Sequence, residues 1–213
     1  MLVLALDTAL GACSVAIGDA QGISACRFEA MGTGHAEALM PMIEAVLAEA
    51  RVAPGQLDRL GVTIGPGSFT GTRIGLAAAR AFGRALGIPV IGVTTFEALA
   101  VRMPGRPRVV AFDARRGQIY VQFFAADGTP RNDGAALEAT DAARHLEEWG
   151  VRDPVLLGSG AAMLGEMTGA EISEYVWPDA SAFLPLIARA PMPKDMPRPL
   201  YLRAPDVTVP ATP

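Results

Sequence analysis

The most distinctive spacing lies in a glycine-rich segment, Gly65-Pro66-Gly67-Ser68-Phe69-Thr70-Gly71-Thr72-Arg73. A glycine-rich turn between a strand and a helix can direct backbone N–H groups at an anion. No lysine follows these glycines, so the segment lacks the lysine of a P-loop. Pro66 and Thr70 stand two residues either side of Ser68, where the nucleophile elbow of hydrolases has glycines. We expect Ser68 to cap the next helix; a hydrolase that uses Ser68 is the less favoured alternative.

Two aspartates, Asp7 and Asp113, each end an apolar run and could aim a carboxylate into a cleft as a ligand of magnesium or water. The competing interpretation is structural, because Asp favours turns in which its carboxylate accepts backbone N–H groups. No further acidic cluster accompanies them, so the structural role is slightly favoured, and both remain weak candidates for cofactor binding. His35 and His145 lie in no HExxH pattern or Cys/His cluster, so neither a metal site nor a catalytic triad is expected.

Short apolar runs and helical periodicity predict the elements that must position these residues. Three strands come first and an alternation of helix and strand follows, which is typical of a mixed sheet with crossover helices. The predicted strands are 2–6, 12–17, 22–28, 58–64 and 89–93, and the predicted helices are 35–50, 68–86 and 96–102.

The same pattern restarts in the second half of the chain. Asp7 and Asp113 each precede a glycine by four residues, Gly11 and Gly117, and a strand follows each glycine. This repetition predicts a duplicated, two-lobe α/β protein. The second copy is weaker, with a strand at 118–124, a helix at 140–149 capped by Thr140, a strand at 155–157 and a helix at 180–190 that contains Pro185.

These elements place a first lobe at residues 1–103, a reduced second lobe at 104–190 and a proline-rich tail at 191–213. The tail is unsuited to a regular helix or a central strand, because proline has no backbone N–H. We expect either a strap over the surface or a partly disordered terminus, and we favour the second.

Composition excludes several classes of protein. Hydrophobic residues make up 51% of the chain and charged residues 19%, which is typical of a globular protein. The net charge of −4 disfavours binding of nucleic acid without a basic partner. Cys13 and Cys26 are too few for a disulfide framework and are expected to be buried thiols. The apolar run at 1–6 lacks preceding basic residues, and no stretch reaches the roughly 18 residues of a membrane helix. We therefore expect a cytoplasmic protein without a membrane partner.

The first two long helices predict a partner interface. The helix at 35–50 has an apolar face of about 160°, wider than the roughly 100° stripe that packing on one sheet requires. The helix at 68–86 carries a small residue at every fourth position, and this row of small residues would let another backbone approach closely. The same helix carries a stripe of arginines. A solvated face is the alternative for the arginines. The residues predicted at the interface are Leu39, Met42, Ile43, Val46, Arg73, Gly75, Ala79 and Arg80.

Several segments resemble the bacterial TsaB family, also called YeaZ. The likeness is carried by residues 4–8, 35–43 and 65–75, and later by 113–120 and 201–203, and it runs from residue 1 to about 203. The resemblance implies an actin-like ATPase (RNase H-like) fold with a reduced second lobe. It also implies a role in forming N6-threonylcarbamoyladenosine at position 37 of tRNAs that read codons beginning with A.

In that pathway the TsaB family supplies the non-catalytic dimerization subunit. The resemblance implies pairing with a TsaD-type transferase, to which a TsaE-type ATPase also binds, while a TsaC-type enzyme supplies threonylcarbamoyl-adenylate. ATP and metal are then expected on partner subunits, with no cofactor on the isolated chain, and tRNA is contacted only indirectly. The interface would also serve a homodimer of this chain when the transferase is absent.

The catalytic paralogue carries a His-x-x-x-His metal pair after the strand predicted here at 89–93. The two positions read Thr95 and Leu99 in this chain. A threonine hydroxyl is a poor metal ligand and leucine is none, so transferase activity of this chain is not expected. The alternative is a small actin-like ATPase or kinase that uses Asp7 and Asp113. Its adenine-binding loop would be only partly present, at residues 157–162, so weak or no ATP binding is expected.

Overall fold

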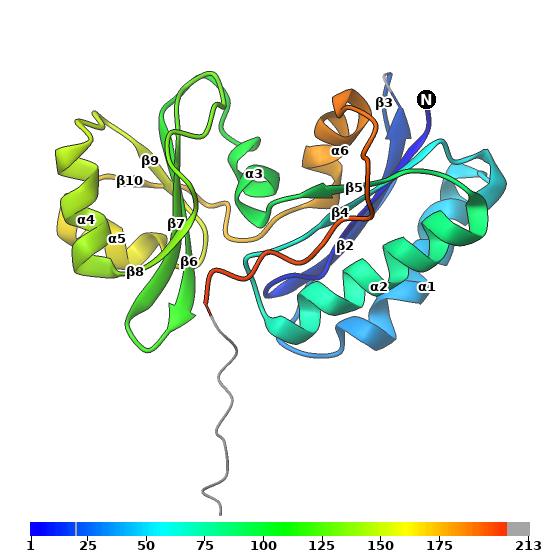
Figure 1. The fold of residues 1–213 in the computed structure, drawn as a ribbon, viewed down its shortest axis with the longest axis horizontal. Helices are drawn as coiled ribbons and strands as arrows, with labels where there is room; N and C mark the ends of the chain where they lie inside the picture. Colours follow the sequence, from blue (N-terminus) through cyan, green and yellow to red (C-terminus); the bar gives the residue numbers. More distant parts are fainter. Residues whose placement is uncertain (20, 204–213) are drawn as a thin grey trace, which may run out of the picture.

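The computed structural model describes residues 1–19 and 21–203, which fold into two lobes, each with a five-stranded mixed sheet (Figure 1). The first sheet has the order β3-β2-β1-β4-β5 and the second the order β10-β9-β6-β7-β8. Each sheet begins as an antiparallel meander of three strands and continues with two parallel strands on the other side of the first one. The two lobes therefore repeat one topology, and the predicted duplication is confirmed.

The elements of the first lobe precede those of the second along the chain, with one exception, α6. The first lobe contains β1 (Val3–Asp7), β2 (Ala12–Asp19), β3 (Gly22–Ala30), α1 (His35–Ala50), the short 3-10 helix η1 (Pro54–Gln56), β4 (Arg59–Thr63), α2 (Phe69–Leu86), β5 (Val90–Val93) and α3 (Thr95–Ala100). The second contains β6 (Arg108–Arg115), β7 (Gln118–Phe124), β8 (Ala135–Glu138), α4 (Ala139–Glu148), β9 (Val155–Leu157), α5 (Ala161–Thr168) and β10 (Glu171–Ile172), and α6 (Ala180–Arg189) follows.

The first sheet is covered on both faces, which explains why all five residues of β1 are buried. Alternate β1 residues, Leu4 and Leu6, face a core that α1 and α2 share. Val3 and Ala5 face the opposite core, which α6 completes. Figure 1 shows α1 and α2 side by side on one face of this sheet and α6 on the other.

Two predictions about the second half of the chain and one about a cysteine are wrong. The predicted second lobe, 104–190, includes α6, yet α6 packs on the first sheet. The chain therefore crosses back to the first lobe after β10. Thr140 is not the cap of α4, because the N-cap position is Glu138, which makes no side-chain capping bond. Cys26 is exposed, whereas Cys13 is buried as expected.

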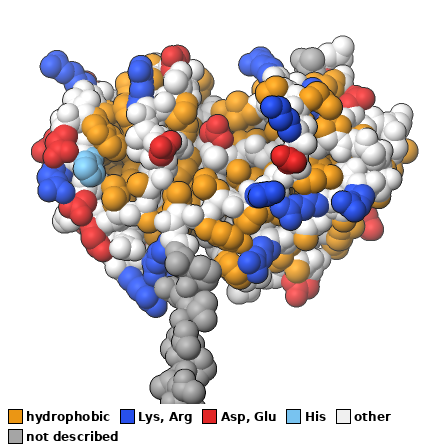
Figure 2. Space-filling view, viewed as in Figure 1, with side chains coloured by type: hydrophobic (Ala, Val, Ile, Leu, Met, Phe, Trp, Pro, Cys, Tyr) orange, Lys and Arg blue, Asp and Glu red, His pale blue; other side chains and the backbone are white. Residues whose placement is uncertain are grey.

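The tail that follows α6 is a strap as far as residue 203, so the favoured expectation of a disordered terminus is wrong for residues 191–203. This strap runs back along α2 toward the second lobe (Figure 1). The rest of the predicted tail, 204–213, lies outside the described residues. Figure 2 shows Lys and Arg side chains gathered on the first lobe, where α2 and the strap lie. In the described part of the chain, no helix is long and apolar enough to cross a membrane.

The close approach of α6 to β4 depends on Gly61, because a Cβ at this position would collide with the Ile187 side chain. We expect Gly61→Ala to lower the free energy of unfolding by about 1–3 kcal/mol, measured by urea unfolding. In an Ile187→Ala background the same substitution should cost little, since the colliding atoms are absent. Gly32→Ala is the control, because open space surrounds Gly32. An equal cost of Gly61→Ala in both backgrounds would contradict the collision.

Candidate functional site

Asp7 is fully buried and lies at the carboxyl end of β1, the end of this central strand that points toward the second lobe. Its Oδ1 accepts hydrogen bonds from Thr63 Oγ1 at 2.5 Å and from the backbone N–H of Ala9 at 3.3 Å. Its Oδ2 is buried and has no hydrogen-bond partner among the described residues. Burial raises the pKa of Asp7 to about 7, although the bonds from Thr63 and Ala9 lower it. Asp7 therefore has the expected structural role in a turn, while its burial disfavours the charged form of the carboxylate.

Asp113, at the matching place in the second lobe, is exposed. Its Oδ1 accepts the backbone N–H of Arg115 at 2.7 Å, and its own N–H donates to Ser159 Oγ at 3.1 Å. These contacts are those of a turn carboxylate, as the structural interpretation predicted. The two aspartates therefore differ: Asp7 is buried with a raised pKa, whereas Asp113 is exposed and bonded within its own lobe.

Apolar side chains fill the junction between the lobes. The inner face of the second sheet and α3 form one buried cluster, in which Phe96 and Phe112 stack with ring centroids 5.8 Å apart. Leu10, Tyr175 and Leu202 pack on this cluster, and they come from the β1–β2 turn, the segment returning to the first lobe, and the strap. The β1–β2 turn is thus in contact with the second lobe.

Both glycine-rich loops use their backbone N–H groups within the chain. In the loop after β9, Gly158 donates to the Tyr175 carbonyl and Gly160 to the Ala111 carbonyl, each at 2.9 Å. At the start of α2, Gly71 N–H donates to Ser68 Oγ at 2.9 Å, so the predicted capping role of Ser68 is confirmed. The Ser68 N–H itself donates to the Ala9 carbonyl at 2.8 Å. These donors are therefore not directed at an anion.

The two positions that the family resemblance matches to the paralogue's metal pair are in the core. Thr95 is fully buried, and its backbone N–H donates to the Gly65 carbonyl at 2.8 Å. Leu99 is fully buried in the cluster between the lobes. No group of three or more potential metal ligands occurs among residues 1–19 and 21–203.

Most residues predicted at the partner interface are instead in the lobe's own core, which corrects that prediction. Those buried between the two helices and the sheet are Leu39, Ile43, Val46, Gly75 and Ala79, each side chain at most 2% exposed where it has one. Met42 is half-buried against the same core. Periodicity identified the apolar face of the helix correctly, but the sheet and α2 together cover a wider face than a sheet alone would.

The predicted arginines hold the strap. Arg73 Nε donates to Tyr201 Oη at 2.9 Å, and its guanidinium lies 3.5 Å from the ring centroid of Phe69. Arg80 donates through Nη2 to the Pro197 carbonyl at 2.5 Å. Sequence reasoning missed these contacts, because the proline content predicts an extended segment without indicating where it lies.

The strap also reaches the other lobe. Leu200 N–H donates to the Ile64 carbonyl at 2.7 Å, and Arg203 Nη1 donates to the Ala114 carbonyl at 3.3 Å. Ile64 follows the first sheet's β4, and Ala114 belongs to the second sheet's β6. The strap therefore joins the two lobes.

The raised pKa of Asp7 has a consequence for stability. The folded chain holds a proton on Asp7 that the unfolded chain releases between about pH 4 and pH 7, so stability should fall as the pH rises through this window. Asp7→Asn removes this ionisation. Relative to the unsubstituted chain, the variant should gain up to about 4 kcal/mol more at pH 8 than at pH 4. Urea unfolding at both pH values measures it, with Asp113→Asn as an exposed control. A stabilisation by Asp7→Asn that is the same at both pH values would contradict it.

Comparisons with known proteins agree with this fold. A family model described as "TsaD: tRNA N6-adenosine threonylcarbamoyltransferase" matches residues 29–172. An uncharacterized protein of Mycobacterium tuberculosis is 35% identical over 96% of this chain and 92% of its own length. An uncharacterized protein of Mycobacterium leprae is 36% identical over 96% of this chain, but the chain spans only 55% of that protein's length.

Two further similarities carry more specific names. The tRNA threonylcarbamoyladenosine biosynthesis protein TsaB of Escherichia coli is 36% identical over 60% of this chain and 56% of its own length. A crystal structure from Pseudomonas aeruginosa, described as similar to the peptidase YEAZ, has a TM-score of 0.81 and 27% identity over 95% of this chain and 99% of that one. The two-lobe architecture is the actin-like ATPase fold. The chain belongs to the TsaD-domain family, among proteins that resemble TsaB and YeaZ.

Proposed function

We propose that this chain is a non-catalytic dimerization subunit that supports a TsaD-type transferase in forming N6-threonylcarbamoyladenosine on tRNA. Two positions carry this proposal, Thr95 and Leu99, which stand where the catalytic paralogue has metal-binding histidines. Both are fully buried in this chain. A leucine in an apolar cluster offers no electron pair to a metal ion, so the chemistry belongs to the partner.

The partners follow from this role. The transferase is the direct partner, the TsaE-type ATPase joins through the complex, and ATP and metal are held by those subunits. The net charge of −4 is consistent with a protein that contacts tRNA only through its partners. A complex of this composition would act in the cytoplasm.

The surface we assign to the transferase is the exposed side of α1 and α2. Its residues, here called the α1–α2 face, are Met40, Ala45 and Ala48 of α1 and Ala77, Ala81, Ala85 and Arg84 of α2. Alanines on neighbouring helices let a partner helix approach closely and pack against both. Met40, 43% exposed, supplies a large apolar side chain. The same face would serve a homodimer, because a self-complementary surface can pair with a copy of itself. The homodimer and the complex with the transferase then exclude each other.

A charged side chain in the middle of this face tests the assignment. Ala81→Arg should weaken the complex with the transferase about tenfold or more and lower tRNA modification in a reconstituted system, because the guanidinium would be buried in the contact. Ala162→Arg is the matched control, since Ala162 is an exposed helical alanine on α5 in the other lobe. Light scattering measures assembly, and nucleoside analysis of the tRNA measures modification.

If Ala81→Arg remains folded and keeps both assembly and modification, the face lies elsewhere. If the complex forms and modification proceeds equally well without this chain, the proposed function itself is wrong. Val46→Glu is unsuitable for this purpose, because Val46 is fully buried and a carboxylate there would destabilise the lobe.

A second candidate function, a small actin-like ATPase, is favoured only by the buried Asp7 carboxylate with its unpartnered Oδ2. The apolar junction and the occupied N–H groups of the loop after β9 argue against it. We expect isothermal titration calorimetry of the isolated chain with MgATP to give no saturable heat in the micromolar range. Micromolar affinity with turnover that Asp7→Asn abolishes would establish the ATPase instead.

A further inference from the structure

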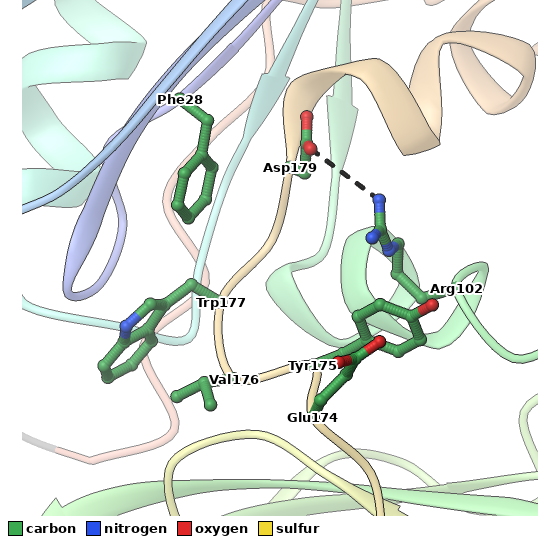
Figure 3. A pocket seen from close by; sticks show the side chains of 7 residues that line it. All are labelled: Phe28, Arg102, Glu174, Tyr175, Val176, Trp177 and Asp179. Carbon is green, nitrogen blue, oxygen red and sulfur yellow. Dashed lines mark ion pairs between the residues drawn. The ribbon is translucent and has the colours of Figure 1, made fainter.

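A separate hollow of about 430 Å³ lies where the chain returns from the second lobe to the first. Figure 3 shows it bordered by Phe28 of β3, by Arg102 just after α3, and by side chains of the segment that precedes α6. Its lining residues are Phe28, Arg102, Glu174, Tyr175, Val176, Trp177 and Asp179. Three of the seven are aromatic, and two carry carboxylates.

The walls of this hollow are fixed by contacts behind them. The Trp177 ring packs so closely on Gly11 that a Cβ on Gly11 would lie 2.6 Å from Trp177 Cζ2. The Tyr175 carbonyl accepts the Gly158 N–H at 2.9 Å. The first contact holds the Trp177 ring and the second holds the Tyr175 backbone in place before any ligand arrives, which reduces the entropy lost on binding.

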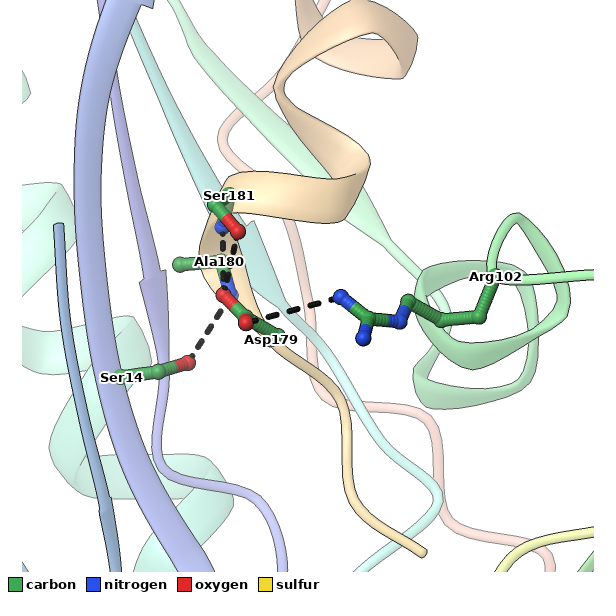
Figure 4. A network of polar contacts seen from close by, with 5 residues as sticks. All are labelled: Ser14, Arg102, Asp179, Ala180 and Ser181. Atoms are coloured by element: carbon green, nitrogen blue, oxygen red, sulfur yellow. Dashed lines mark hydrogen bonds and ion pairs between the residues drawn. The ribbon is translucent and has the colours of Figure 1, made fainter. Parts of the chain in front are cut away.

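Asp179 is held by two groups on different sides. One oxygen, Oδ1, accepts the Ser181 N–H at 2.9 Å at the start of α6, and Oδ2 lies 3.7 Å from Arg102 Nη1 (Figure 4). The next residue along the chain, Ala180, donates its N–H to Ser14 Oγ of β2 at 3.0 Å. The carboxylate therefore has a fixed position beside the first sheet.

The charge of the hollow favours a cation. Arg102 is paired with Asp179, and its guanidinium lies 4.3 Å from the ring centroid of Tyr175. This cation is thus balanced within the wall. Glu174 adds a second carboxylate that is exposed and has no ion pair among the described residues. Rings beside an uncompensated carboxylate are the surroundings that a guanidinium or ammonium group prefers.

The neighbouring strand indicates how such a group would be presented. β3 is an edge of the first sheet, and of its nine residues only Ala25 is buried. Phe28 is 47% exposed and belongs both to this edge and to the hollow. An unpaired edge strand offers main-chain N–H and C=O groups to an extended segment of another protein.

We propose that this hollow binds a Lys or Arg side chain of an extended protein segment that lies along β3. The backbone of the segment pairs with the edge strand, and its basic side chain enters between Phe28 and Trp177 toward Glu174. The site is separate from the α1–α2 face and does not depend on the proposed function.

The probe is the peptide acetyl-Thr-Val-Lys-Val-Thr-amide, with norleucine in place of lysine in the matched peptide. Amide NMR of the full chain reports binding through the β3 amides and the Trp177 indole N–H, which Trp149→Phe identifies among the two tryptophans. We expect the lysine peptide to shift these signals saturably. The norleucine peptide should bind about 5- to 10-fold more weakly, because it keeps the four-carbon chain and lacks the charged ammonium group.

Exposed residues supply the variants, so folding is retained. Glu174→Gln and Phe28→Ala should each weaken the lysine peptide about fivefold or more. Glu166→Gln removes an exposed carboxylate from α5, and Ile23→Ala truncates an exposed apolar side chain at the far end of β3 from Phe28; neither residue lines the hollow, and both should leave binding unchanged. Equal binding of the two peptides would overturn the proposal, and so would an unshifted Trp177 signal. A homodimer that Phe28→Ala dissociates would also overturn it, since a second copy would then occupy the edge.

Discussion

The packing of Leu10, Tyr175 and Leu202 on the cluster of Phe96 and Phe112 holds the two lobes together. These three side chains come from distant parts of the chain and meet between the lobes. Burying a large apolar side chain contributes roughly 1.5–3 kcal/mol, so separating the lobes would expose several such contributions at once. The two lobes are therefore held together by a shared apolar core. Such a junction fits the scaffold role proposed above better than an enzyme that must admit a nucleotide and release it.

The burial of Asp7 is tolerated because of this apolar packing. Its carboxylate has one oxygen satisfied and the other without a partner in the described part of the chain, and burial raises its pKa to about 7. A buried carboxyl group of this kind lowers stability at neutral pH. Apolar packing around the junction offsets that cost.

Much of the fold could be predicted because it depends on local patterns and on a repeat. The bounds of α1, β7 and β9 agree with the prediction to the residue. The prediction of the interface failed for a physical reason. An apolar helical face containing Val46 has the same sequence pattern whether a partner or the chain's own sheet covers it. The strap, the return of α6 to the first sheet and the hollow beside Trp177 depend on contacts between distant residues, such as Gly61 with Ile187 and Gly11 with Trp177. No pattern of neighbouring residues encodes those contacts.

The hollow and the closed junction share one segment of chain. Tyr175 packs on the cluster between the lobes and also lines the hollow, while two residues later Trp177 rests on Gly11 of the β1–β2 turn. Leu10, the neighbour of Gly11, belongs to the junction as well. The rings that would receive a basic side chain are therefore held by the same contacts that keep the lobes together. A partner that moved the lobes apart would also displace these rings, so the hollow has its shape only while the junction is closed.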